Sequence, residues 1–216
     1  MNNNLLEERI INTKVFKSLF TNNSKALAKL ISDITRIPYK KLQNNIVIST
    51  NEIPITNKNK KNDFIVMLSS KPLITKNLNT KKYKGLKTKN LSYSINLISD
   101  KNNYNNKFLI IQINFNTFSD KSSKYIDVFE LRNQKGKKYI DNFKIYTLDI
   151  VKCHKIYYNN FNNNNNIIKW GTFLYSKPTD KNIINIIDNI LDNKALKEIK
   201  LKLDNINEEI VSSKKL

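Results

Sequence analysis

Lysines and a few isolated carboxylates are the side chains best able to do chemistry in this 216-residue chain. Asp63 stands directly before an apolar run, and the next acid along the chain is Asp100. An Asp at the head of a strand is either a ligand for a hard cation or a solvated carboxylate at a loop end. Lysines flank it on both sides, at Lys58, Lys60, Lys61, Lys76, Lys81, Lys82, Lys84, Lys87 and Lys89. We expect these ammonium groups to gather at one edge of a sheet and to contact phosphates.

The charge of the whole chain favours the same kind of partner. Lys and Arg number 38 against 18 Asp and Glu, which gives a formal net charge of +20. Such a field attracts polyanions. The abundance of Asn, Lys and Ile is also typical of coding drift in an AT-rich genome, but drift does not explain the shortage of acids. We therefore expect binding to DNA or RNA, with Tyr83 and Tyr93 available to stack on unpaired bases.

Other chemistries find little support. Cys153 is the only cysteine, which excludes an intrachain disulfide and a cysteine-based zinc site. We place Cys153 and His154 next to each other at a strand end, where neighbouring side chains point to opposite faces and cannot form a nucleophile pair. The chain has neither the glycine-rich phosphate loop G-x-x-x-x-G-K-(S/T) nor a dinucleotide-binding fingerprint.

The expected setting is intracellular. A lone cysteine suits a reducing compartment. Residues 1–9 contain no apolar stretch of the kind found in signal peptides, and no run approaches the roughly 20 apolar residues that span a bilayer. We expect a soluble protein without a membrane partner.

Hydrophobic spacing and turn residues predict a mixed α/β chain. Helical spacing between Ile10 and Ile37 predicts two helices, the second capped by Asn23 or Ser24. The turn signal Asn133–Gly136 joins two strands into a long hairpin. The expected strands are 45–50, 64–68, a returning strand from 73, 107–115, 125–131 and 144–150; the further helices are 83–98 and one or two within 180–210, and 159–166 is an Asn-rich loop.

An ordered set of local patterns resembles the PD-(D/E)xK nuclease-fold transposase family, the recombination-promoting nucleases. Most of residues 10–177 take part. The opening helix Val15–Phe20 is similar to the family's V-F-K-x-(L/I)-F, and Trp170–Leu174 is similar to its W-x-x-F-L helix. The other matching segments are Leu30–Ile34, Asn51–Pro54, Ile113–Phe118, Tyr125–Leu131 and Ile145–Ile150.

This resemblance implies a restriction-endonuclease-like mixed sheet core flanked by helices. The nuclease-like domain would occupy residues 1–178, and residues 179–216 would form a C-terminal helical extension. We expect that extension to pack on the domain or on a second copy of the chain in a homodimer.

The resemblance also implies a site that binds Mg²⁺. Asp63 occupies the place of the family's metal-binding Asp, and the family has an E-x-Q tripeptide on the following strand. By spacing, Asn77 stands in place of the Glu and Asn79 in place of the Gln. An amide oxygen brings no negative charge, so Asp63 alone would hold Mg²⁺ poorly. Glu52 is the one nearby carboxylate that could replace the missing Glu.

The sequence therefore predicts a nucleic-acid-binding protein of the PD-(D/E)xK transposase family with impaired catalysis. Two alternatives stay open. The first is an active, metal-dependent DNA endonuclease that uses Asp63 with Glu52. The second is a basic structural protein that packages or contacts nucleic acid in a virus or mobile element.

Overall fold

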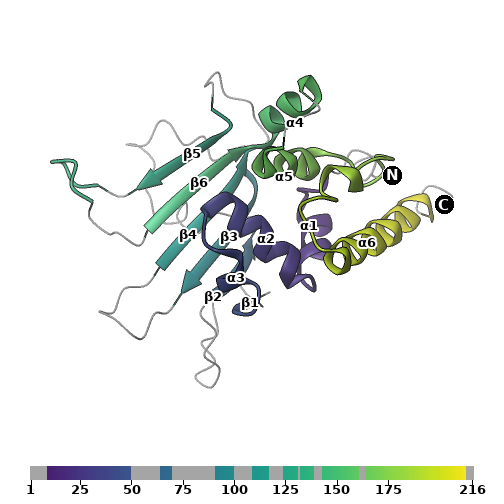
Figure 1. Ribbon diagram of the computed structural model, residues 1–216, viewed down its shortest axis with the longest axis horizontal. Helices are drawn as coiled ribbons and strands as arrows, with labels where there is room; N and C mark the ends of the chain where they lie inside the picture. The colour runs from purple at the N-terminus through teal and green to yellow at the C-terminus, as the bar shows by residue number, and fades with distance from the viewer. Residues whose placement is uncertain are drawn as a thin grey trace.

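A computed structural model describes residues 9–49, 64–69, 91–99, 109–116, 124–130, 132–138, 143–160 and 164–212. These residues form a mixed α/β fold in which helices flank one sheet and a long helix follows at the C-terminal end (Figure 1). Within the described ranges, no helix is both long and apolar enough to cross a membrane.

The chain enters the fold through three short helices, α1 (Thr13–Phe20), α2 (Ser24–Thr35) and α3 (Tyr39–Leu42). Asn23 caps α2, as predicted, because its side-chain oxygen accepts a hydrogen bond from the backbone N–H of Ala26. Arg36 ends α2 in the left-handed conformation with φ of 62°, and its N–H donates to the carbonyl of Ser32. Both ends of α2 are therefore specified locally.

The sheet contains six described strands in the order β1-β2-β3-β4-β6-β5. Their bounds are β1 Ile46–Ser49, β2 Phe64–Ser69, β3 Leu91–Ser99, β4 Leu109–Asn116, β5 Ile126–Glu130 and β6 Phe143–Asp149. β1 is parallel to β2 and β4 is parallel to β6, whereas the β2–β3, β3–β4 and β5–β6 pairs are antiparallel. The predicted strands at 45–50, 64–68 and 107–115 and the β5–β6 hairpin are confirmed.

The prediction of a helix over 83–98 was wrong in the part that the structure describes. Residues 91–99 form β3, which pairs with strands on both sides. Leu91, Ile95 and Ile98 have helical spacing, but Leu91, Tyr93, Ile95 and Leu97 also alternate with polar residues, which is the period of a strand. Pairing with β2 and β4 favours the strand over the helix for these residues. Residues 83–90, the turn at 70–72 and the returning strand from 73 lie outside the described residues.

The interpretation of Cys153 and His154 as strand-end residues was also wrong. β6 ends at Asp149, and helix α4 (Ile150–Asn159) contains both side chains. The carboxylate of Asp149 accepts a hydrogen bond from the N–H of Lys152, so the last strand residue is also the helix N-cap. That cap signal was present in the sequence and was overlooked.

Helix α5 (Asn166–Tyr175) follows the predicted Asn-rich loop. Asn165 caps it by accepting from the N–H groups of Ile167 and Ile168. Residues 161–163 of the loop are not among those described. α4 and α5 pack against each other, and α5 also contacts α2.

The C-terminal part forms a short 3₁₀ turn, η5 (Ile184–Ile186), and one long helix, α6 (Asn193–Ser212). Ala195, Ile199 and Leu203 recur at helical spacing and are buried. Asn23 donates from its side chain to the carbonyl of Ala195 at 3.0 Å, and Lys202 donates to the carbonyl of Leu19 at 3.1 Å. α6 therefore packs against α1 and α2 of the same chain.

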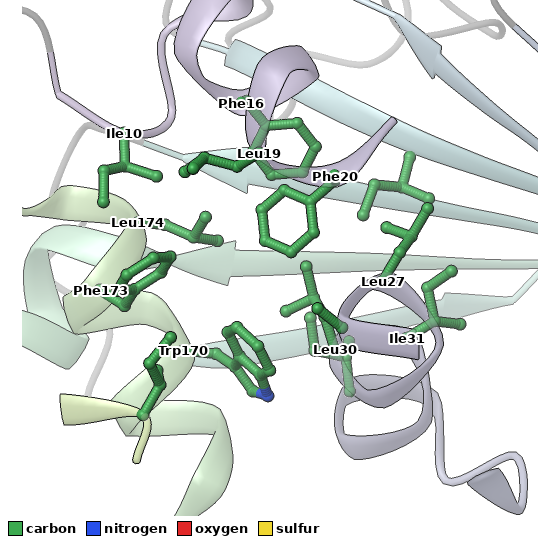
Figure 2. Close-up of a cluster of buried hydrophobic side chains, with 14 of the residues drawn as sticks. Ile10, Phe16, Leu19, Phe20, Leu27, Leu30, Ile31, Trp170, Phe173 and Leu174 are labelled. Carbon is green, nitrogen blue, oxygen red and sulfur yellow. The ribbon is translucent and has the colours of Figure 1, made fainter. Parts of the chain in front are cut away.

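The core lies between the sheet and the helices α1, α2 and α5 (Figure 2). Phe20 lies between Phe16 and Trp170, with ring centroids 4.6 and 6.3 Å away, and Phe16 reaches Phe115 of β4 at 5.9 Å. Trp170 and Phe173 are fully buried. This aromatic cluster packs α1 against α5, although the two helices are far apart in the sequence.

Candidate nucleic-acid interface

The side chains predicted to form the catalytic site lie outside the described residues. They are Asp63, Glu52, Asn77 and Asn79. The predicted phosphate-binding residues Lys58, Lys60, Lys61, Lys76, Lys81, Lys82, Lys84, Lys87 and Lys89, and the stacking residue Tyr83, also lie there. The structure does describe β2, which starts one residue after Asp63, and the strands beside it. Tyr93 lies in β3, where its backbone pairs with Phe115.

The strands that follow β2 across the sheet carry neutral polar residues. β3 contains Ser, Asn and Tyr but no acid, and β4 contributes Gln112 and Asn114. Both β4 side chains are buried, and Gln112 donates to the Oδ1 atom of Asn114 at 2.8 Å. Within the part of the chain that the structure describes, the Oε1 atom of Gln112 accepts no hydrogen bond. In the backbone register, Ser94 stands opposite Asn114 and Asn96 opposite Gln112.

The nearest described carboxylates lie further along the sheet. Asp149 of β6 stands opposite Asn116, and Asp127 of β5 stands opposite Thr147. Asp149 already caps α4 and lies 3.8 Å from the ammonium of Lys152. The described ranges hold no group of three or more His, Cys, Asp or Glu side chains that could bind a metal. Neutral amide and hydroxyl oxygens can ligate Mg²⁺ but bring no negative charge, so a magnesium site here would depend on Asp63 and Glu52.

A basic turn joins β5 to β6, and we call residues Arg132–Lys138 the hairpin tip. Figure 1 shows the hairpin tip at the end of the molecule far from α6. Asn133 organises it: its carbonyl accepts from the N–H of Gly136, and its side chain accepts from the N–H groups of Lys135 and Lys137. Gly136 has φ of 76°, a conformation that glycine adopts without strain. The turn is thus held by its own hydrogen bonds.

Glu130 is the carboxylate beside this turn. Arg132 approaches it at 3.1 Å and Lys138 at 2.9 Å, and the Lys138 hydrogen bond is the main reason why the pKa of Glu130 is lowered. Lys135 and Lys137 are exposed and have no ion pair among the described residues. The four basic groups of the hairpin tip against one carboxylate leave a local net charge of +3.

Some other described lysines are balanced by acids, whereas the exposed Arg36, Lys40 and Lys41 around α3 have no ion pair among the described residues. On α2, Lys29 pairs with Asp33 at 2.7 Å, and Lys25 lies 3.7 Å from Asp192. α6 carries four lysines and four acids, so its net charge is zero. The hairpin tip is therefore a concentrated patch of positive charge. Its signal was visible in the sequence as four basic residues within 132–138, but only the turn residues were recognised.

Cys153 does not act as a nucleophile in this arrangement. It is fully buried, and burial raises the pKa of its thiol well above the usual range, so the thiolate is scarce. Its neighbour His154 packs between the rings of Tyr158 and Tyr175 instead, at 4.6 and 4.9 Å between centroids. The guanidinium of Arg9 lies 3.5 Å from the centroid of the Tyr175 ring. This cluster ties the start of the described chain to α4 and α5.

No protein-family model, curated protein or solved structure matched the chain when it was compared with them.

Proposed function

We propose that this protein binds nucleic acid and that its core is a restriction-endonuclease-like domain of the PD-(D/E)xK transposase kind. The observation that carries the proposal is the excess of 38 basic residues over 18 acids. Lysines and arginines that contact a phosphate backbone release its condensed counterions, and that release drives binding without sequence preference.

The family part of the proposal is supported by the N-terminal helices, the mixed sheet and the Trp170 helix, which occur in the order that the resemblance implies. Trp170 packs against Phe20 of the V-F-K-x-(L/I)-F segment, so two of the matching motifs meet in one core. One element departs from the expected order, because β3 is a strand where hydrophobic spacing predicted a helix.

Impaired catalysis is part of the same proposal. Cleavage of a phosphodiester by Mg²⁺ needs carboxylates that hold the ion and a water that it can activate. Asn77 and Asn79 would replace charged and polar residues of the family motif, and β3 and β4 supply no carboxylate. A retained metal site would therefore rest on Asp63 with Glu52.

A plasmid assay tests cleavage and binding together. Wild type and Asp63→Ala are incubated with supercoiled plasmid and Mg²⁺ or Mn²⁺, and retardation is followed on a gel over a range of salt concentrations. We expect both proteins to retard DNA, less so as salt rises, and neither to nick it. Nicking by wild type alone would show an active endonuclease and make Glu52→Ala the next variant. Absence of salt-dependent retardation would overturn nucleic-acid binding.

A further inference from the structure

The tip of the β5–β6 hairpin extends beyond the strands that it joins and carries an unbalanced charge. β5 pairs only with β6 among the described strands, so its other edge faces away from the sheet. The helices that cover the sheet lie elsewhere, and the hairpin tip extends beyond them (Figure 1). All seven residues of the hairpin tip are exposed. A surface of this shape is free to meet a large partner.

The charge arrangement of the hairpin points to a phosphate partner. Glu130 forms ion pairs with Arg132 and Lys138 and neutralises part of their charge. The backbones of Arg132 and Lys138 also form an antiparallel bridge, so these contacts hold the two chain segments together at the base of the turn. Arg132 also donates to the carbonyl of Gly136 at 2.8 Å. Among the described residues, the ammonium groups of Lys135 and Lys137 have no such structural partner, so they are available for an anion.

An exposed aromatic ring lies on β5, three residues before the cationic turn begins. Phe129 is 44% exposed, and because neighbouring side chains of a strand alternate, it lies on the opposite face from Glu130. The exposed part of the phenyl ring is apolar surface on which a partner could pack. Bases of an unpaired strand stack on such rings while neighbouring cations hold the phosphates.

We infer that the β5–β6 hairpin binds single-stranded nucleic acid, with Lys135 and Lys137 on phosphates and Phe129 stacking on a base. The inference rests on the proposed nucleic-acid binding and names a contact surface for it. The binding shows little sequence preference, because phosphates and base faces are common to every sequence.

Charge and stacking are tested separately by fluorescence anisotropy with a labelled oligothymidine at several salt concentrations. In Lys135→Gln/Lys137→Gln, the slope of log affinity against log salt falls by about 1.4, which corresponds to two phosphate contacts at about 0.7 each. In Phe129→Leu, affinity falls by about tenfold and the slope stays unchanged, since one stacked base contributes on the order of 1–3 kcal/mol.

Matched controls change charge or apolar surface elsewhere. Lys197→Gln/Lys200→Gln removes two exposed lysines from the charge-balanced α6, and Val128→Ala trims a 50% exposed aliphatic residue of β5. Both controls keep the wild-type affinity and slope. Circular dichroism confirms that every variant is folded.

The outcomes separate the two proposals. If wild type shows no salt-dependent binding, the proposed function fails. If wild type binds but the hairpin variants match it, or the α6 control weakens binding equally, the hairpin is not the contact surface. If a duplex of the same length binds more tightly than the single strand, the stacking role of Phe129 is wrong.

Discussion

The indole N–H of Trp170 donates to the Oδ2 atom of Asp33 at 2.9 Å, which joins α5 to α2. Trp170 is fully buried, and its N–H has no competing partner in water. The other oxygen of Asp33 accepts from Lys29 at 2.7 Å and from Asn166 at 3.3 Å. A single carboxylate thus satisfies the polar atom of the largest core residue and links two helices that are distant in sequence.

Asp33→Ala should destabilise the fold by about 1–3 kcal/mol, because the buried indole N–H then has no acceptor. Urea unfolding followed by the fluorescence of Trp170 measures the change. Trp170→Phe removes the donor, so Asp33→Ala should lower the free energy of unfolding by less in that background. Unfolding of the Trp170→Phe proteins is followed by circular dichroism. If Asp33→Ala lowered the free energy of unfolding equally in both backgrounds, Asp33 and Trp170 would not be coupled. The exposed pair of Lys25 with Asp192 serves as a control, since Lys25→Ala should cost under about 1 kcal/mol.

Gly171→Ala should destabilise through a clash with α4. A Cβ at this position would lie 2.5 Å from the Cβ and 2.6 Å from the sulfur of Cys153, and overpacking of this kind costs about 1–3 kcal/mol or more. Cys153→Gly removes both clashing atoms, so the double variant should lose less than the two single changes together.

Gly136→Ala provides the comparison for that clash. A Cβ at Gly136 would meet nothing within 4 Å, but φ of 76° is unfavourable for alanine by about 1–2 kcal/mol. This cost should be the same with or without Cys153→Gly. A coupling between Gly136 and Cys153 as large as that for Gly171 would show that the effect is not a local clash.

Cys153 should react with thiol reagents only when the protein opens. The thiol is fully buried and its pKa is raised by burial, so the native protein should be modified far more slowly than the denatured chain. The rate of reaction with a chromogenic disulfide, with and without denaturant, checks this. Rapid modification of the native protein would mean that α4 and α5 separate readily.

His154 should make stability depend on pH below about 6.5. Burial is the main cause that lowers its pKa in the folded state; Arg9 lowers it further and Asp180 partly opposes them. The folded protein therefore binds this proton less readily than the unfolded chain, and stability falls as pH drops from the ordinary pKa toward the folded one. Above that pH range the histidine is neutral in both the folded and the unfolded state, so it does not make stability depend on pH.

His154→Gln tests the pH dependence, because glutamine does not titrate. Urea midpoints are measured between neutral and mildly acidic pH for wild type and variant. The rings of Tyr158 and Tyr175, which pack against the histidine, remain in place in both proteins. The wild-type midpoint should fall with pH more steeply than that of the variant. Parallel curves would exclude His154 as the cause.

Several features of this fold depend on interactions close in sequence, and the sequence alone determined them. Asn23 caps the helix that begins at the next residue, and Asn133 with Gly136 forms a turn through hydrogen bonds within a few residues. Apolar content marked 64–68 as a strand. The charge imbalance of the chain is likewise a property of composition.

Only the tertiary structure decided the features that depend on distant partners. Residues 91–99 fit a helical and a strand period, and pairing with β2 and β4 selects the strand. The sequence lists lysines without saying which have acids beside them. Folding brings Asp192 to Lys25 and Glu130 to Lys138, and it leaves Lys135 and Lys137 at an exposed turn without an ion pair among the described residues. Local hydrogen bonds are encoded in adjacent residues, whereas strand pairing and charge balance across a surface depend on residues that meet only in three dimensions.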